Sequence, residues 1–248
     1  MFRTLTALPL TLTLAAFSVV TTSCGSTNKA QIRVINAIPD SAPTDIRVNG
    51  TRIIPDLVFG TIQPDTTPAS YFAVTSGSDI VQGFAPGDTT NPISPIGTFT
   101  LNGSTDYTVV AVGLELDDET PLLLIDDNTA PTSGNAEFRI VNASLNSPAN
   151  GVDVYIVPPG TDITSYTPQI TALGQGQGSA YQSVPFITGG YAVVITATSK
   201  KAALITQPCA NIQPCTLQAG SIRTLVILDN AGGSNGMSQT PLVLSDLN

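Results

Sequence analysis

The sequence of 248 residues contains no histidine and no tryptophan, and only 11% of its residues are charged. The missing histidine excludes a Ser-His-Asp triad, a Cys-His dyad, a histidine general base and every histidine-ligated metal site. Nine basic residues stand against 18 acidic ones, a formal net charge of -9, so no electrostatic binding to nucleic acid is expected. The 21 glycines and 19 prolines favour turns and short strands over long helices. No motif indicates a cofactor.

The N-terminus has the pattern of an export signal. Arg3 precedes an apolar stretch, Leu5–Val20, which is followed by the small polar residues 21–23 and then Cys24. A membrane-spanning anchor is the alternative interpretation, but this stretch is shorter than the roughly 20 apolar residues that a spanning helix needs. Residues 1–23 are therefore predicted to be a cleaved signal peptide.

The end of this signal resembles the lipobox of bacterial lipoproteins, with Thr21 where that motif usually has leucine. The resemblance implies that Cys24 is lipidated and that residues 24–29 form a tether. Gly25, in place of Asp, implies export to the outer membrane. Because the chain is acidic, attachment to a membrane is expected through the lipid and not through a basic surface.

The other two cysteines, Cys209 and Cys215, lie close together in the segment PCANIQPC. A zinc site would need two more soft ligands, which a chain without histidine does not supply. In an exported protein this pair is predicted to form a local disulfide, with free thiols as the alternative.

Comparison of the chain with itself indicates an internal duplication. Three segments recur in the same order: RVINA (33–37) as RIVNA (139–143), DIRV (45–48) as DVYI (153–156), and TPLLLIDDN (120–128) as TPLVLSDLN (240–248). The repeats predict two modules, residues 30–133 and 134–248. Between them, Pro131 and Gly134 lie in a segment that is typical of a linker.

Within each module apolar residues alternate with polar ones, which is typical of half-buried strands. Strands are predicted at 106–114, 190–198, 221–228 and 241–244, which are rich in β-branched or aromatic residues, and no helix is predicted. Asn49-Gly50 and Asn102-Gly103 are predicted to be type I′ hairpin turns. About seven short strands in each module predict two tandem immunoglobulin-like antiparallel β-sandwiches, each with its own core.

An arginine and an aspartate recur in both modules, Arg33 with Asp45 and Arg139 with Asp153. Because each is flanked by apolar residues, we expect these four side chains to form cross-strand pairs on the solvated face of a sheet. The alternative is a functional polar spot presented once in each module.

The order of RVINA, PDSAPTDIRVNG (39–50), FGT (59–61), YTVVAVG (107–113) and LLLIDDN (122–128) resembles the bacterial family of domain of unknown function 4397 (DUF4397). The second module keeps RIVNA, DVYI and the final strand. The resemblance implies a β-sandwich found in exported and lipid-anchored surface proteins, in two tandem copies. The family has no assigned activity, so it implies no functional residues.

Two further motifs have simple structural interpretations. The segment GQGQGS (174–179) lacks the closing Gly-Lys-Ser/Thr of a phosphate-binding loop and is predicted to be a loop between strands. The acidic residues 115–119, followed by Asp126 and Asp127, are either a charged hairpin tip or a weak candidate for a calcium site. The candidate calcium ligands are Asp117, Asp118, Asp126 and Asp127.

These features predict a noncatalytic lipoprotein of the bacterial cell envelope, at the outer membrane or cell surface, which presents two sandwiches for interaction, adhesion or scaffolding. The expected partner is an envelope protein or glycan, bound by loops of the second module. Three alternatives stay open: a secreted polysaccharide hydrolase that uses paired carboxylates, a calcium-binding structural protein, and a structural component without a specific ligand.

Overall fold

The computed structural model describes residues 28–66, 69–114, 121–210, 215–233 and 236–247. Its regular structure consists of strands β1–β18 and two single-turn 3-10 helices. Within these ranges there is no helix that is both long and apolar enough to span a membrane. The all-β fold class predicted from the sequence is confirmed.

Strands β1–β9 form the first sandwich, which we call the first half. Its outer sheet has the order β3-β2-β6-β7, and its inner sheet has the order β4-β1-β8-β9 with β5 beside β1. The bounds are β1 (Ala30–Asn36), β2 (Thr44–Val48), β3 (Thr51–Leu57), β4 (Thr61–Gln63), β5 (Phe72–Val74), β6 (Gly77–Phe84), β7 (Pro92–Leu101), β8 (Asp106–Ala111) and β9 (Leu122–Ile125).

Strands β10–β18 form the second half with the same arrangement. The outer sheet has the order β12-β11-β15-β16, and the inner sheet has the order β13-β10-β17-β18 with β14 beside β10. The bounds are β10 (Asn135–Asn142), β11 (Val152–Val157), η1 (Ile163–Ser165), β12 (Ile170–Leu173), β13 (Gln177–Gly178), β14 (Gln182–Pro185), β15 (Tyr191–Ala197), β16 (Ala203–Cys209), β17 (Ile222–Ile227), η2 (Ala231–Gly233) and β18 (Leu242–Leu247).

One strand pair in each half is parallel. β1 runs parallel to β8, and β10 runs parallel to β17, while every other pair of named strands is antiparallel. Because these parallel partners lie far apart in the sequence, no local turn signal indicates their pairing.

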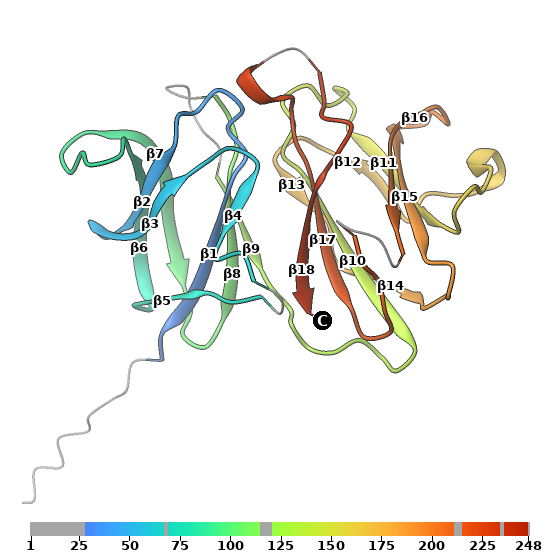
Figure 1. The fold of residues 1–248 in the computed structure, drawn as a ribbon, viewed down its shortest axis with the longest axis horizontal. Helices are drawn as coiled ribbons and strands as arrows, with labels where there is room; N and C mark the ends of the chain where they lie inside the picture. The colour runs from blue at the N-terminus through green and yellow to red at the C-terminus, as the bar shows by residue number, and fades with distance from the viewer. Residues whose placement is uncertain (1–27, 67–68, 115–120, 211–214, 234–235, 248) are drawn as a thin grey trace, which may run out of the picture.

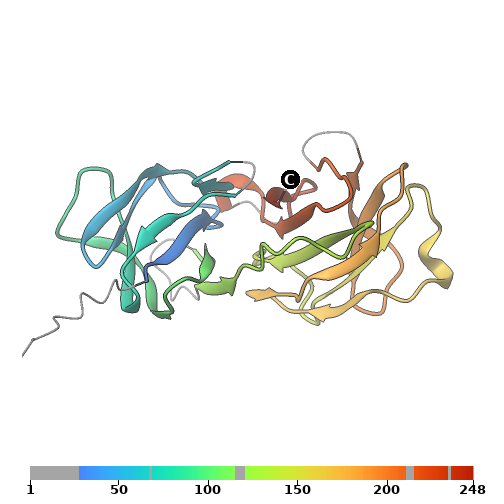
Figure 2. The same ribbon diagram turned by 90° about the horizontal axis from the view of Figure 1, so that it is seen from below.

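The four sheets form four layers, with the two inner sheets face to face in the middle of the molecule (Figure 1). The view from below shows the same two sandwiches side by side (Figure 2). Each half has its own core between its two sheets. A third core lies between the halves and contains Ile35, Ala37, Ile62, Val110 and Val112 from the first, and Val141, Ala143, Val226, Leu228 and Leu244 from the second.

The repeated motif that begins with Arg33 or Arg139 explains this third core. In β1, Ile32 and Val34 point into the first sandwich, while Arg33 and Ile35 point toward the second half. β10 alternates in the same way, so both strands are buried on both faces. A strand with two buried faces does not show strict alternation of apolar and polar residues, as the adjacent apolar residues Val34 and Ile35 show.

The expected pairs Arg33–Asp45 and Arg139–Asp153 on a solvated face are wrong, because all four side chains are buried. Arg33 contacts Asp246 at 2.5 Å and Asp126 at 3.1 Å, and Arg139 contacts Asp126 at 2.7 Å. Each arginine therefore pairs with a carboxylate of the other half. We call Arg33, Asp126, Arg139 and Asp246 the interface ion cluster.

The interface ion cluster repeats its side contacts in the two halves. Arg33 donates from Nε to Thr108 at 2.8 Å, and Arg139 donates from Nε to Thr224 at 3.0 Å. Thr108 donates to Asp126, and Thr224 donates to Asp246, both at 2.5 Å. An aromatic ring lies against each arginine of the interface ion cluster, Tyr71 against Arg33 and Tyr181 against Arg139.

The recurring Asp45 and Asp153 have a different structural role. Each lies opposite a bulge in the neighbouring edge strand, and its Oδ1 accepts the backbone N–H of the bulged residue, Asp56 at 3.0 Å and Ala172 at 2.9 Å. Asp56 and Ala172 have positive φ angles of 47° and 50°. The buried carboxylate satisfies the backbone group that the bulge leaves without a ladder partner.

The two predicted hairpin turns have different outcomes. Asn49 and Gly50 both have positive φ and connect β2 to β3, so the type I′ turn is confirmed. The prediction at Asn102-Gly103 is wrong, because this segment joins strands of different sheets and the residue with positive φ is Ser104. Gly103 is needed for another reason, since a Cβ there would lie 2.3 Å from the carbonyl oxygen of Asn28.

Candidate functional site

The two halves differ most at one connection of the outer sheets. In the first half two residues, Asn49 and Gly50, join β2 to β3. In the second half the twelve residues 158–169 join the equivalent strands β11 and β12. Loops much longer than a hairpin needs are often functional, so this insertion marks the first place to look for a site.

The insertion folds back over the outer face of the second half. Ile163, in η1, packs on Tyr155 and Val157 of β11 and on Ala192 and Val194 of β15, and all five side chains are buried. These side chains form a small apolar cluster on the side of the sheet that faces away from the main core. The insertion is therefore anchored to the sheet by hydrophobic contacts.

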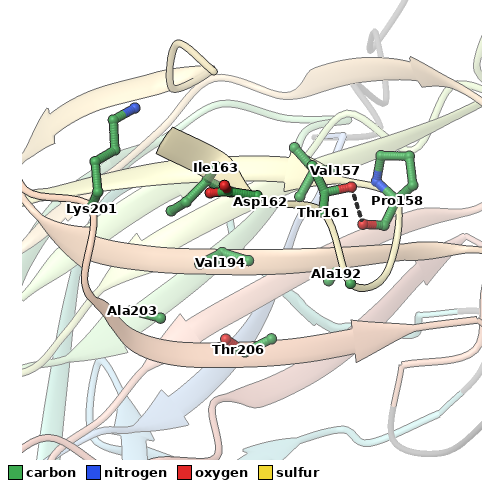
Figure 3. Close-up of a pocket in the computed structure, with 11 residues that line it drawn as sticks. Val157, Pro158, Thr161, Asp162, Ile163, Ala192, Val194, Lys201, Ala203 and Thr206 are labelled. Atoms are coloured by element: carbon green, nitrogen blue, oxygen red, sulfur yellow. Dashed lines mark hydrogen bonds between the residues drawn. The ribbon is translucent and has the colours of Figure 1, made fainter. Parts of the chain in front are cut away.

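A pocket of about 250 Å³ lies beside this cluster (Figure 3). Its floor is formed by small or short side chains of β15 and β16, namely Ala192, Val194, Ala203 and Thr206. The insertion supplies one wall, and a hydrogen bond from the Thr161 hydroxyl to the Pro158 carbonyl, 2.6 Å long, closes its first turn. The volume is just below the usual range for small-ligand pockets.

Lys201 supplies the positive charge at this pocket. Its Nζ donates to the Tyr155 hydroxyl at 3.0 Å and to the Tyr166 carbonyl, and it lies 4.6 Å from the centre of the Tyr155 ring. These contacts fix the ammonium group between the insertion and the sheet. Tyr166 itself is 45% exposed.

Asp162 supplies the negative charge. Its carboxylate accepts the backbone N–H of Thr164 at 2.9 Å and so caps η1. Hydrogen bonds from Thr164 lower the pKa of Asp162 from its ordinary value. An acid and a fixed ammonium group on an apolar floor can orient a polar ligand, but they do not by themselves perform acid–base chemistry.

Comparison with protein-family models identifies the first half. The family described as domain of unknown function (DUF4397) matches residues 30–155, half of the chain. The chain belongs to this family. The DUF4397 match covers the whole first half, β10 and most of β11, and it ends before the insertion that forms the pocket. Comparison with curated proteins found no match.

Among solved structures, the DUF4397 chain is similar to one described as "Alpha-glucan binding by a streptococcal virulence factor". The identity is 8%, the TM-score is 0.27, and the match covers 85% of this chain and 97% of that chain. A likeness at this level has no bearing on function.

The cysteine predictions have separate outcomes. Cys209 and Cys215 form a disulfide, as predicted, and both side chains are buried in the core of the second half. The bridge joins the end of β16 to the segment before β17. Cys24, the predicted lipidation site, lies outside the described residues, as do the signal peptide and most of the tether.

The weak calcium candidates are separated by the fold. Asp126 is a member of the interface ion cluster, whereas its neighbour Asp127 is exposed and accepts the backbone N–H of Thr129 at 2.9 Å. Asp117 and Asp118 lie outside the described residues. Within the described ranges no three acidic or cysteine side chains gather as a metal site would require.

The glycine-rich segment 174–179 contains β13 and lies at the interface between the halves. A Cβ at Gly178 would lie 2.7 Å from a methyl group of Leu124 in the first half. Glycine is therefore needed here for close approach of the halves. The pocket of the insertion was not among the sequence predictions, although the unequal lengths between DIRV or DVYI and the next strand are a signal for it.

Proposed function

We propose that this DUF4397 protein is a noncatalytic binding protein of the bacterial cell envelope and that its ligand site is the pocket formed by residues 158–169. The observation that carries the proposal is the insertion itself. Twelve residues replace a two-residue turn, bury Ile163 on the outer face of the second half, and leave a pocket with Lys201 and Asp162 beside it. The expected ligand is a segment of an envelope glycan or protein.

The proposed attachment is a lipid on Cys24. The apolar signal before this cysteine and the small residues next to it support the proposal. Asn28 is four residues after Cys24, so the first half would begin within about 14 Å of the lipid. The insertion projects from the far side of the second half (Figure 1), which would place the pocket away from the membrane.

Five of the six aspartates that are buried in the described part of the chain support a noncatalytic role, because their carboxylates hold the fold together. Asp45 and Asp153 satisfy bulges, Asp126 and Asp246 hold the two halves together, and Asp229 accepts the backbone N–H groups of residues 145 and 146. A general acid or base must be free to exchange a proton with a substrate. These five carboxylates are instead occupied by the hydrogen bonds and ion pairs that stabilise the fold.

We also propose that the second half is a further copy of the DUF4397 module. The identical strand orders, the two bulge carboxylates and the matching contacts of Arg33 and Arg139 support this. The insertion would then be the feature that gives the second copy its separate role.

A pocket-filling substitution tests the ligand site. Ala203 is exposed and lies on the pocket floor, so Ala203→Trp fills the pocket without disturbing a core. Thr100→Phe, at an exposed position on β7 of the first half, is the matched control. We expect Ala203→Trp to lower retention of the mature protein on isolated envelope fragments about tenfold, while Thr100→Phe leaves it unchanged. Fractionation into polysaccharide and protein identifies the partner, and equal retention of both variants rules out this pocket.

Protease shaving of intact and lysed cells tests the proposed location. For a surface protein, we expect the protease to release peptides of both sandwich halves from intact cells. Lysed cells are the control. Protection until lysis contradicts surface exposure and directs the search to partners inside the envelope. Loss of membrane association in a Cys24→Ser variant tests the lipid attachment.

A further inference from the structure

A second pocket lies in the first half, at the end of the sandwich where β1 begins. Its volume is about 180 Å³, and its polar lining consists of Lys29, Asn49, Thr51, Thr75 and Asp79. The remaining walls are aliphatic. This pocket is separate from the insertion of the second half, and neither the sequence analysis nor the proposed function assigns it a role.

Asp79 is an unusual residue for its position. β6 alternates so that Asp79 and Val81 both point inward, and Asp79 is only 2% exposed. In the second half the same inward position holds Tyr191, five residues before Thr196 as Asp79 is five residues before Phe84. The Tyr191 hydroxyl donates to the Pro185 carbonyl. The fold therefore accepts a neutral side chain here, and it does not itself require a carboxylate.

Only one oxygen of this carboxylate is satisfied. Oδ1 accepts a hydrogen bond from Asn49 Nδ2 at 2.6 Å, and Asn49 is in turn held by the backbone N–H of Ile80 at 2.9 Å. Oδ2 is buried and has no hydrogen-bond partner among the described residues. A buried charged oxygen without a donor is costly, so a donor from outside the chain would be strongly favoured.

We propose that this pocket binds a small zwitterion whose primary ammonium group donates to Asp79 and whose anionic group faces Lys29. Asp79 lines the pocket, so an ammonium group bound there would lie beside its carboxylate. Lys29 forms no ion pair within the described part of the chain, and it lines the same pocket. The two opposite charges match a ligand that carries both.

The walls favour an organic ammonium over a metal ion. Calcium takes six to eight oxygen ligands, whereas this pocket offers one carboxylate, one amide and two hydroxyl groups. Ile53 and Val74 supply aliphatic surface, which suits the methylene groups between an amine and an anion. The shared chemistry is that of a phosphoethanolamine group, either free or as a lipid headgroup.

The position of Lys29 in the chain would bring the pocket within reach of lipid headgroups. Lys29 is five residues after Cys24, so an extended tether would hold the pocket within about 17 Å of a lipid on that cysteine. This part of the inference rests on the proposed lipid attachment, whereas binding of a free zwitterion does not.

The test is a titration of the mature protein with O-phosphoethanolamine, followed by the NMR signals of the Asn49 side-chain amide and the Ile80 backbone amide. We expect both signals to move and Asp79→Asn to weaken binding about tenfold or more. The same substitution should raise the melting temperature of the free protein, because it removes a buried unpaired charge without changing shape. Asp127→Asn, at an exposed acid outside both pockets, is the control and should bind normally.

Further arms separate the sources and the alternatives. Lys29→Met should weaken binding of O-phosphoethanolamine but leave binding of ethylamine unchanged. Preference for phosphatidylethanolamine vesicles over phosphatidylcholine vesicles assigns the lipid as source, and binding of the free compound with no vesicle preference assigns the free zwitterion. Absence of binding in all arms, binding that survives in Asp79→Asn, a response to Ca²⁺ alone, or a lower melting temperature of Asp79→Asn would overturn the proposal.

Discussion

At the scale of single residues, Asp126 is a charged residue whose buried carboxylate pairs with arginines of both halves. Its carboxylate forms ion pairs with Arg139 at 2.7 Å and Arg33 at 3.1 Å. It also accepts hydrogen bonds from the hydroxyl groups of Thr108 at 2.5 Å and Tyr71 at 2.9 Å. It is one of two negative groups between two buried arginines. Loss of such a group leaves positive charge in a site from which water is excluded.

We therefore expect Asp126→Ala to lower the free energy of unfolding by about 3–5 kcal/mol, because both arginines lose a buried partner. The neighbouring Asp127→Ala is the matched control, since Asp127 is exposed, and its effect should stay within about 0.5 kcal/mol. Urea unfolding of the two variants measures the difference. Equal losses of stability would contradict the role assigned to the interface ion cluster.

The two tyrosines of the interface predict a dependence on alkaline pH. Burial raises the pKa of both Tyr71 and Tyr181, and the charges of Asp126 and Asp246, respectively, raise it further. Because the folded pKa lies above the unfolded value of about 10, their contribution to stability is complete below pH 10 and falls as the pH rises. Each tyrosine should remove about 1.4 kcal/mol per pH unit there.

Tyr181→Phe should make this alkaline slope shallower by about 1.4 kcal/mol per pH unit, because one titrating group is lost. Tyr166→Phe, at an exposed tyrosine, should leave the slope unchanged. Denaturant unfolding at several pH values between 9 and 12 measures the slopes. The same slope for the wild-type protein and Tyr181→Phe would show that Tyr181 keeps no extra proton in the folded state.

The recurrence of Arg33 and Arg139 was visible in the sequence, but their partners were not. A local pattern suggests pairing with the nearest recurring acid, Asp45 or Asp153. The actual pairs join residues of different halves, which no spacing within one repeat encodes. Asp45 and Asp153 recur because both edge strands carry a bulge at the same place, and a bulge has no distinct sequence signal here.

At the scale of elements, alternation of apolar residues predicted the strands that are half buried or fully buried, and the predicted ranges 106–114, 190–198 and 221–228 contain β8, β15 and β17. The pairing of those strands was not predictable, because β1–β8 and β10–β17 are long-range parallel pairs. The pocket was also missed, since the insertion, with three prolines in twelve residues, is typical of an ordinary loop. What folds it back is one buried side chain, Ile163.

The short strand β13 contacts β9 of the first half outside the interface ion cluster. Gly178→Val should lower the free energy of unfolding by about 1–3 kcal/mol, because its Cβ meets Leu124 at 2.7 Å and the added methyl groups overpack the interface. Gly189→Val is the control, since a Cβ there meets no atom within 4 Å. Adding Leu124→Ala should recover part of the loss, and no recovery in thermal unfolding of the double variant would place the strain elsewhere.

At the scale of the whole molecule, the two halves form one structural unit. The third core and the interface ion cluster bury one face of each inner sheet against the other half. A truncated first half would expose Ile35 and Val110 together with Arg33 and Asp126, which have partners in the second half. Deletion of residues 134–248 is therefore expected to unfold the first half, so that the ligand site must be located with point variants.

This interface predicts that the protein unfolds in a single transition. Calorimetry should give a ratio of van't Hoff to calorimetric enthalpy of about 1, because neither half is stable with its inner face exposed. Residues 24–133 and 134–248 produced separately should aggregate, whereas the two produced together should associate. Asp126→Ala supplies the internal control, since it weakens only the interface and should lower the melting temperature while the ratio stays at about 1. Soluble, separately folded halves with two transitions in the wild-type protein would mean that each sandwich is stable alone, and that the buried charges between them hold two independent domains in a fixed orientation.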